Sequence, residues 1–225
     1  MTFCNFPALD EPLCIEQHQA NVLAIETVEI YSKVVYSLYQ RDLGLEPDYP
    51  FVIFDDNFKK ITALTIVQNP LLFNFNTTTF KKLLFHQIIG KIDIDERLHI
   101  EKSYTDMVEY FQQEIFTALD IDFFVNETCK IEDVLKLMQV DILDSTSSIF
   151  EKCQLILNVL KEVKNEKLII FCGLGELLSK EEYCLVIEAA NLNQQQVLLI
   201  EHGAISNSEK TRYFFLDEDL ILWEE

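Results

Sequence analysis

The sequence predicts an α/β protein in which an α/β head is interrupted by a helical leg. Two short runs near the end of the chain, "LIIFC" and "VLLIE", are almost wholly apolar. Such runs are typical of parallel strands that are covered by helices on both faces. Helical patterns precede and separate them, so residues 147–202 have the order helix, strand, helix, strand that indicates a βα-type core.

The helices of this core have clear start signals. Ser148 and Glu151 have the serine-x-x-glutamate spacing of a capping box, and Ser179 and Glu182 repeat it before the second helix. Apolar residues follow the three-four spacing of one helix face at Ile149, Cys153, Ile156, Leu160 and Val163.

The first part of the chain supplies further elements of the head. We expect an irregular segment up to about Gln19, a strand at "NVLAIE" and a helix at "VEIYSKVVYSLYQ". Thr27 is the expected cap of that helix, and its buried face would carry Val28, Tyr31, Val35 and Leu38 or Tyr39. "FVIFDDNFKKI" predicts a strand, a turn and a returning strand, and "TALTIVQ" predicts another strand.

The middle of the chain has a helical character. "NTTTFKKLLFHQIIGKI" and "HIEKSYTDMVEYFQQEIFTALD" predict two helices that form an antiparallel hairpin, and "IEDVLKLM" predicts a short third one. The tail "RYFFLDEDLILWEE" ends in a strand-like run. We therefore expect the head to comprise residues 1–62 and 140–225, and the leg to comprise residues 63–139.

The formal net charge of -20 at first argues against nucleic acid as a partner. The distribution of charge points the other way, because no acid occurs from Asn57 to Ile92. Five lysines in or beside the predicted leg fall in this window, and they are the candidate DNA-binding residues: Lys59, Lys60, Lys81, Lys82 and Lys91. The alternative is a set of solvated lysines around an apolar helix.

The composition also indicates where in the cell the protein is found. No apolar run reaches the length of a membrane span, and the N-terminal segment has acids and prolines rather than a basic, apolar signal. The six cysteines form no CxxC pair, which favours reduced core thiols over a disulfide or zinc framework. We expect a cytoplasmic protein.

The sequence lacks the common catalytic motifs. A Gly-Lys-Ser/Thr phosphate loop does not occur, no Gly-x-Ser-x-Gly elbow occurs, and the four histidines lack metal-ligand spacing. "CGLGELL" has two of the three glycines of a dinucleotide fingerprint, but Leu178 stands at the third position, which favours a tight strand-to-helix turn. These absences predict a protein that is not an enzyme.

One group of acids is a candidate metal site. Carboxylates near a helix end can supply the oxygen ligands that calcium prefers. The candidates share a short acidic stretch after the long leg helix: Asp120, Asp122, Glu127, Glu132 and Asp133. The stretch is not an EF-hand, because Val125 and Ile131 replace its glycine and its bidentate glutamate. A solvated acidic surface is the alternative.

Several segments together resemble a known family. "LDEPLCIE", "SSIFEKCQLIL", "EKLIIF", "LLSKEE", "VLLIE" and "FLDEDLIL" look like the Csn-type DNA-end-binding accessory protein of type II-A CRISPR adaptation. The resemblance covers nearly the whole chain. It implies a kinase-like α/β head without its phosphate-binding loop, a helical leg, a homotetrameric ring, and calcium bound where the acidic stretch lies. Phe123 and Phe124 stand where the family has further acids.

The resemblance also implies a function. We expect non-enzymatic, sequence-independent binding of double-stranded DNA ends in the hole of the ring, in support of the acquisition of new CRISPR spacers for antiviral defence. The implied partners are other adaptation proteins, namely the integrase complex and the effector nuclease. Two alternatives remain: an acidic protein-binding scaffold or DNA mimic without DNA affinity, and a divergent nucleotide kinase, which the missing phosphate loop disfavours.

Overall fold

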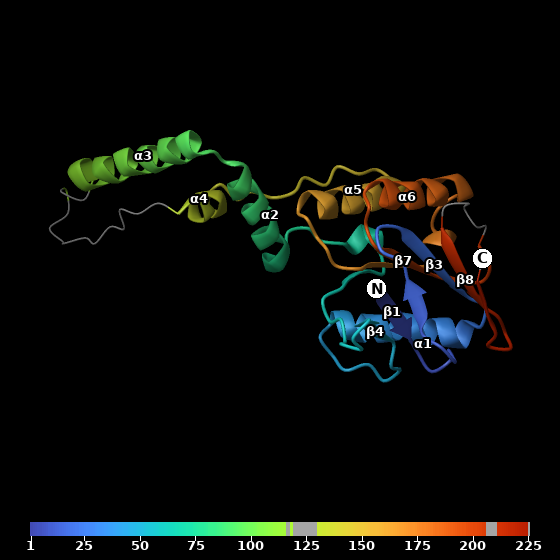
Figure 1. Ribbon diagram of the computed structural model, residues 1–225. Helices are drawn as coiled ribbons and strands as arrows, with labels where there is room; N and C mark the ends of the chain where they lie inside the picture. Colours follow the sequence, from blue (N-terminus) through green and yellow to red (C-terminus); the bar gives the residue numbers. More distant parts are fainter. Residues whose placement is uncertain (116–117, 119–129, 206–210, 225) are drawn as a thin grey trace. The chain divides into compact units, whose positions relative to one another are not determined.

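The computed structural model describes residues 1–115, 118, 130–205 and 211–224 (Figure 1). The chain divides into two compact units. The head comprises residues 1–73 and 145–225, and the leg comprises residues 74–144.

A six-stranded sheet forms the centre of the head, in the order β5-β6-β7-β3-β8-β9. The central strand β3 (Ala20–Ile25) runs parallel to β7 (Val197–His202) on one side and to β8 (Arg212–Leu216) on the other. Three shorter strands complete the sheet: β5 (Thr65–Val67), β6 (Ile169–Cys172) and β9 (Leu222–Glu224). Only the β8–β9 pairing at one edge is antiparallel. The predicted α/β class is confirmed.

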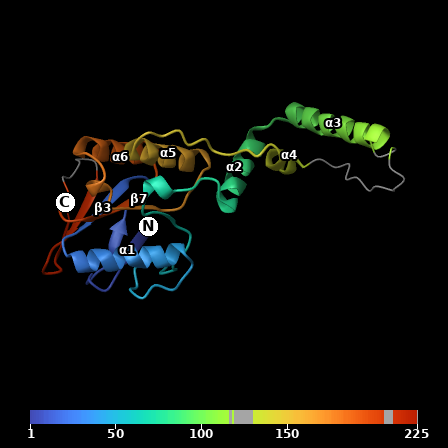
Figure 2. The ribbon, with the colours of Figure 1, turned by 180° about the vertical axis from the view of Figure 1, so that it is seen from behind.

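Helices cover both faces of this sheet (Figures 1 and 2). α5 (Ile149–Glu162) and α6 (Lys180–Leu192) lie side by side on one face, and α1 (Val28–Asp42) lies on the opposite side. Two single 3-10 turns occur at Pro70–Leu72 and Leu174–Glu176. Every residue of β3 is buried, and an apolar core of the head includes Leu23 and Ile25 of this strand.

The expectation of an irregular N-terminal segment is wrong. β1 (Thr2–Asn5) and β2 (Leu13–Ile15) pair with each other, and β1 also pairs with β4 (Val52–Asp55) to form a second, antiparallel sheet. These strands have only three or four residues, which is too short to give a period-2 pattern in the sequence. Pairing with a distant strand stabilises them.

The local helix signals are partly confirmed. Ser179 and Glu182 form a complete capping box at the start of α6. Ser148 caps α5, but the Glu151 carboxylate accepts hydrogen bonds from the amide and hydroxyl of Ser147 instead. On α1 the expectation for Val28 is wrong: it lies in the first turn and is 60% exposed, whereas Leu38 is buried as expected.

The leg does not contain the predicted helix hairpin. α4 (Ile131–Leu137) packs against α2 (Thr78–Lys91) and contacts α3 (Ile94–Tyr110), which continues into a π-turn at Phe111–Ile115. Phe85 of α2 forms a small apolar core with Ile131 and Leu135 of α4. The short helix α4 therefore occupies the face of α2 that a hairpin partner would cover.

The limits of the two units also differ from those expected. Residues 63–73 belong to the head, because β5 pairs with β6 at the edge of the large sheet. Residues 140–144 belong to the leg, where Val140 packs on the leg core.

Along α3 and the π-turn, several large apolar side chains are exposed: Ile94, Leu98, Met107, Tyr110 and Phe111.

The structure also bears on the cysteines and on membrane-spanning segments. The five described cysteines are free, and burial raises the pKa of Cys4, Cys153 and Cys172 to about 12. These are inert core thiols. No helix in the described part of the chain is long and apolar enough to cross a membrane.

One carboxyl is buried inside the head. Glu201, near the end of β7, is 1% exposed and accepts a hydrogen bond from the amide of Gly175 at 3.0 Å. Burial raises the pKa of Glu201 to about 7, although the backbone amides of Gly175 and Leu174 oppose the shift. The folded state therefore holds a proton that the unfolded chain releases near pH 4.5.

This burial predicts a pH-dependent stability. Between pH 4.5 and 7 the folded state binds more protons at Glu201 than the unfolded state, so this group lowers stability as the pH rises, by up to roughly 3 kcal/mol. Glu201→Gln should remove that contribution. We expect a free energy of unfolding near wild type at pH 5 but higher than wild type at pH 8, measured by urea titration. A difference that does not change with pH would contradict the assignment.

Candidate nucleic-acid interface

Two of the candidate lysines, Lys81 and Lys82, lie in the second turn of α2. Thr77 caps this helix by accepting a hydrogen bond from the amide of Phe80 at 3.3 Å. Lys81 is half-buried and forms an ion pair with Asp141, whereas the neighbouring Lys82 is exposed. The apolar residues of α2 face the leg core, which leaves the lysines toward solvent.

A concave surface in the leg contains both lysines. This groove, which we call the leg groove, has a volume of about 560 Å³ and lies between α2, α4 and residues 139–141. Its charged lining residues are Lys81, Lys82, Lys136, Glu132 and Asp141. The groove thus places three cations and two carboxylates within one hollow.

Lys136 was not among the residues predicted from the sequence. Its ammonium lies 3.0 Å from Oδ1 of Asp133 and 3.4 Å from Oε1 of Glu132. The hydrogen bond to Asp133 raises the pKa of Lys136, so this side chain stays protonated and positively charged. The i, i+4 spacing of Glu132 and Lys136 was the available signal, but nothing in the sequence placed α4 beside α2.

The other lysine candidates lie elsewhere. Lys59 and Lys60 are exposed on the turn after β4, where the carboxylate of Asp55 accepts hydrogen bonds from the amides of Asn57 and Lys59, at 2.9 Å each. This turn therefore carries acids as well as lysines, and it belongs to the head. Lys91 is exposed in the last turn of α2, about 15 Å along the helix from Lys81.

The metal candidates are only partly described. Asp120, Asp122 and Glu127 lie outside the described residues. Glu132 and Asp133 occupy the first turn of α4, and both form ion pairs with Lys136. Their oxygens are of the kind that calcium binds, but two carboxylates fall short of the six to eight oxygens that it requires. No group of three His, Cys, Asp or Glu side chains able to hold a metal occurs among the residues described.

The described connection between β3 and α1 is too short for a phosphate loop. In nucleotide-binding α/β proteins this loop connects a strand to a helix and presents its amides to the phosphates. Only Glu26 and Thr27 connect β3 to α1, and Glu26 places a negative charge at that helix start.

The glycines after β6 have a structural role. Gly173 has a φ of 68°, and the amide of Gly175 is bonded to Glu201 rather than free for an anion. A β-carbon at Gly175 would collide with the side chain of Ile205. The prediction of a tight strand-to-helix turn is confirmed.

Comparison with known proteins identifies relatives over nearly the whole chain. The chain is 29% identical to the CRISPR-associated protein Csn2 of Streptococcus agalactiae over 229 residues, which cover 96% of this chain and 98% of that protein. It is 27% identical to Csn2 of Enterococcus faecalis over 226 residues, covering 97% and 96% respectively.

A solved structure supports the fold. The crystal structure of Stu0660 of Streptococcus thermophilus matches with a TM-score of 0.60 at 11% identity, over 96% of this chain and 74% of that one. A family model described as CRISPR-associated protein (Cas_Csn2) matches residues 44–220, which is well over half of the chain. The chain therefore belongs to the Csn2 family of CRISPR-associated proteins.

Proposed function

We propose that this protein binds the ends of double-stranded DNA without sequence preference, in the hole of a homotetrameric ring, and supports the acquisition of new CRISPR spacers. The observation that carries the proposal is the leg groove of a CRISPR-associated protein, where Lys81 and Lys82 stand on the solvent side of α2. Lysines that neutralise phosphates give salt-dependent affinity that is independent of sequence.

The net charge fits this arrangement. A chain of charge -20 repels DNA over most of its surface, so productive contact is confined to the few places where lysines gather. In a ring, each lysine is repeated by every subunit. A small number of cations per chain, with Lys59, Lys60 and Lys91 as the further candidates, is then sufficient.

The exposed apolar surface of α3 supports self-association. Ile94 is 77% exposed and Leu98 is 57% exposed, on a helix that packs mainly against α4 and the π-turn within the described part of its own chain. Large apolar side chains in such positions favour contact with another copy. We propose that this surface is covered by other subunits of the tetramer.

We further propose that the protein is not an enzyme and acts in the cytoplasm with the integrase complex and the effector nuclease of CRISPR adaptation. The two-residue connection between β3 and α1 supports the first point, because it leaves no loop to hold the phosphates of ATP or GTP. The net charge of -20 favours an acidic protein-binding scaffold as the second candidate function.

A charge reversal in the leg groove tests the proposed interface. Lys81→Glu combined with Lys82→Glu should leave the oligomer intact but remove most binding to linear duplex DNA, because each subunit then adds two negative charges to the hole. Fluorescence anisotropy at fixed salt measures the binding, and solution mass checks the assembly. The matched control is Lys33→Glu with Lys180→Glu, which makes the same charge change on α1 and α6. Equal loss of binding in the control would refute a local interface.

Asp141 offers a test in the opposite direction. Its carboxylate forms an ion pair with Lys81, so it competes with a DNA phosphate for the same ammonium group. Asp141→Asn should therefore tighten duplex binding, by about threefold to tenfold at low salt, and the gain should shrink as salt rises. If Asp141→Asn tightens binding no more than Asp48→Asn in the head, Lys81 does not contact DNA.

We also propose that calcium binds the acidic stretch from Asp120 to Asp133. A cation that binds only the folded protein raises the melting temperature by mass action, and an excess of ~100-fold over the dissociation constant contributes about 2.7 kcal/mol. Asp120→Asn with Asp122→Asn should abolish the shift that calcium causes, measured by calorimetry. An unchanged response in the double variant would assign calcium to other carboxylates.

A further inference from the structure

A second concave site lies in the head, at the amino-terminal ends of strands β3, β6 and β7. It has a volume of about 390 Å³ and is formed by three connections: the β2–β3 turn, the α5–β6 connection and the α6–β7 connection. We call it the lysine pocket, because Lys161, Lys164 and Lys167 line it together with His18 and Gln194. None of these residues is a candidate for the DNA interface in the leg.

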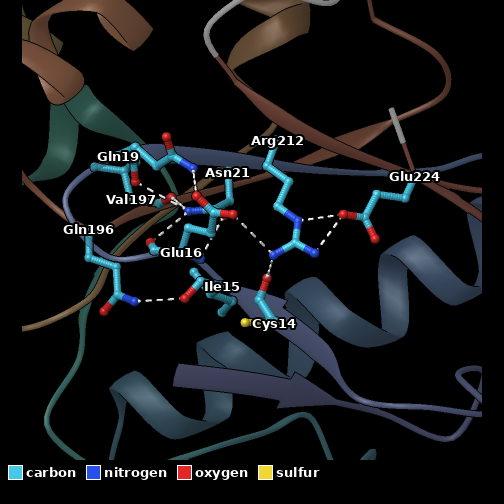
Figure 3. A network of polar contacts seen from close by, with 9 residues as sticks. All are labelled: Cys14, Ile15, Glu16, Gln19, Asn21, Gln196, Val197, Arg212 and Glu224. Carbon is cyan, nitrogen blue, oxygen red and sulfur yellow. Dashed lines mark hydrogen bonds and ion pairs between the residues drawn. The ribbon is translucent and has the colours of Figure 1, made fainter. Parts of the chain in front are cut away.

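Polar contacts fix the walls of the lysine pocket. Nζ of Lys161 donates to Oδ1 of Asn193 at 2.9 Å, and Nδ1 of His18 lies 3.1 Å from the carbonyl oxygen of Gln194. Figure 3 shows the network behind this wall, in which Nε2 of Gln196 donates to the carbonyl oxygen of Ile15 at 3.1 Å. The buried side chain of Asn21 donates to the carbonyl oxygens of Glu16, Gln19 and Val197 and thereby holds the β2–β3 turn against β7. The pocket is therefore preformed.

The backbone around the pocket is unusual. His18, Lys164 and Gln194 have φ values of 62°, 51° and 53°, which lie in the left-handed region where glycine costs least. Three of the six described non-glycine residues with positive φ thus line this one pocket. Lys164 and Gln194 each follow the cap residue of a helix, a position that commonly holds glycine. The chain keeps polar side chains where glycine would relieve strain, as is common at binding sites.

The three lysines of the pocket form no ion pair within the described structure. Elsewhere Lys33, Lys136 and Arg212 form ion pairs with carboxylates. No carboxylate among the described residues lies within ion-pair distance of Lys161, Lys164 or Lys167. Glu166 is the single acid that lines the pocket. In a chain of charge -20, this hollow is cationic.

A structural role for the lysines accounts for only part of these observations. Lys161 lies in the last turn of α5, where a positive charge stabilises the helix end. Lys167 lies beyond that helix. Glycine at position 164 would end the helix with less backbone strain than lysine does. Helix termination therefore does not explain why three lysines gather around a preformed hollow.

We propose that the lysine pocket binds a phosphate group. Ammonium groups are strong phosphate ligands, and the side-chain amides of Gln17 and Gln194 supply further donors around the same hollow. The phosphate comes either from a small phosphorylated molecule or from the backbone of a nucleic acid. The pocket is separate from the leg groove, so the inference does not depend on the function proposed above.

Binding of inorganic pyrophosphate tests the proposal on the full-length protein. Isothermal titration in calcium-free buffer should show saturable binding by the wild type. Lys161→Glu with Lys164→Glu should weaken it at least about tenfold, because removing one ammonium–phosphate interaction has an effect of that order. The charge-matched control Lys33→Glu with Lys180→Glu should bind pyrophosphate as the wild type does. No binding by the wild type, or equal binding by the pocket variant, overturns the proposal.

Two glycine substitutions separate binding from folding. Lys164→Gly should raise the melting temperature, because it relieves the left-handed strain, yet weaken pyrophosphate binding. Gln194→Gly relieves similar strain without removing a charge, so it should raise the melting temperature and retain most of the affinity. If Lys164→Gly binds pyrophosphate as well as Gln194→Gly does, the lysine serves structure alone and the proposal fails.

Binding of linear duplex DNA by the pocket variant, Lys161→Glu with Lys164→Glu, identifies the source of the phosphate. If the pocket variant also loses affinity for linear duplex DNA, in proportion to its loss for pyrophosphate, the natural ligand is a nucleic-acid backbone. If duplex binding is unchanged while pyrophosphate binding falls, the ligand is a small phosphorylated molecule. Either result supports a phosphate site in the head.

Discussion

The parallel pairing of β3 with β7 and β8 determines the fold of the head. It joins residues 20–25 to residues 197–202 and 212–216, so the head cannot form until both ends of the chain are present. Because β3 is buried throughout, helices must cover both faces of the sheet, and α1, α5 and α6 do so. Residues 74–144 lie between these parts in the sequence and fold into a unit with its own small core.

Charge is the second organising feature, and its local arrangement matters more than its total. In the leg groove the ammonium groups of Lys81 and Lys136 are already engaged by Asp141, Glu132 and Asp133. A phosphate that enters the groove must exchange with these carboxylates, which makes the affinity sensitive to salt and to any cation that binds the acids. In the lysine pocket of the head, Glu166 is the one lining acid and no described carboxylate forms an ion pair with a lysine. The two cationic hollows therefore differ in how readily they accept an anion.

The sequence correctly predicted those helices and strands whose structure depends mainly on their own residues. The unbroken apolar runs of β6 and β7 and the serine-x-x-glutamate signal at Ser179 identified elements that the structure contains. The missing phosphate loop could also be read directly. Contacts between segments that are distant in the sequence could not be predicted. β1 and β2 are stabilised by pairing with β4, and α4 packs where a hairpin partner of α2 was expected. Asp141 forms an ion pair with Lys81, which is far from it in the sequence. The lysine pocket was missed for the same reason, since three separate connections form it.

The proposed enclosure of the ends of double-stranded DNA is tested by the topology of the DNA. Linear duplexes and covalently closed circles of the same sequence and length carry the same phosphates, so simple electrostatic binding treats them alike. We predict that the protein, at a mass that confirms the tetramer, binds the linear duplex and leaves the closed circle free in a mobility-shift titration. Equal binding to both forms, or binding to neither, would show that the protein does not enclose DNA ends.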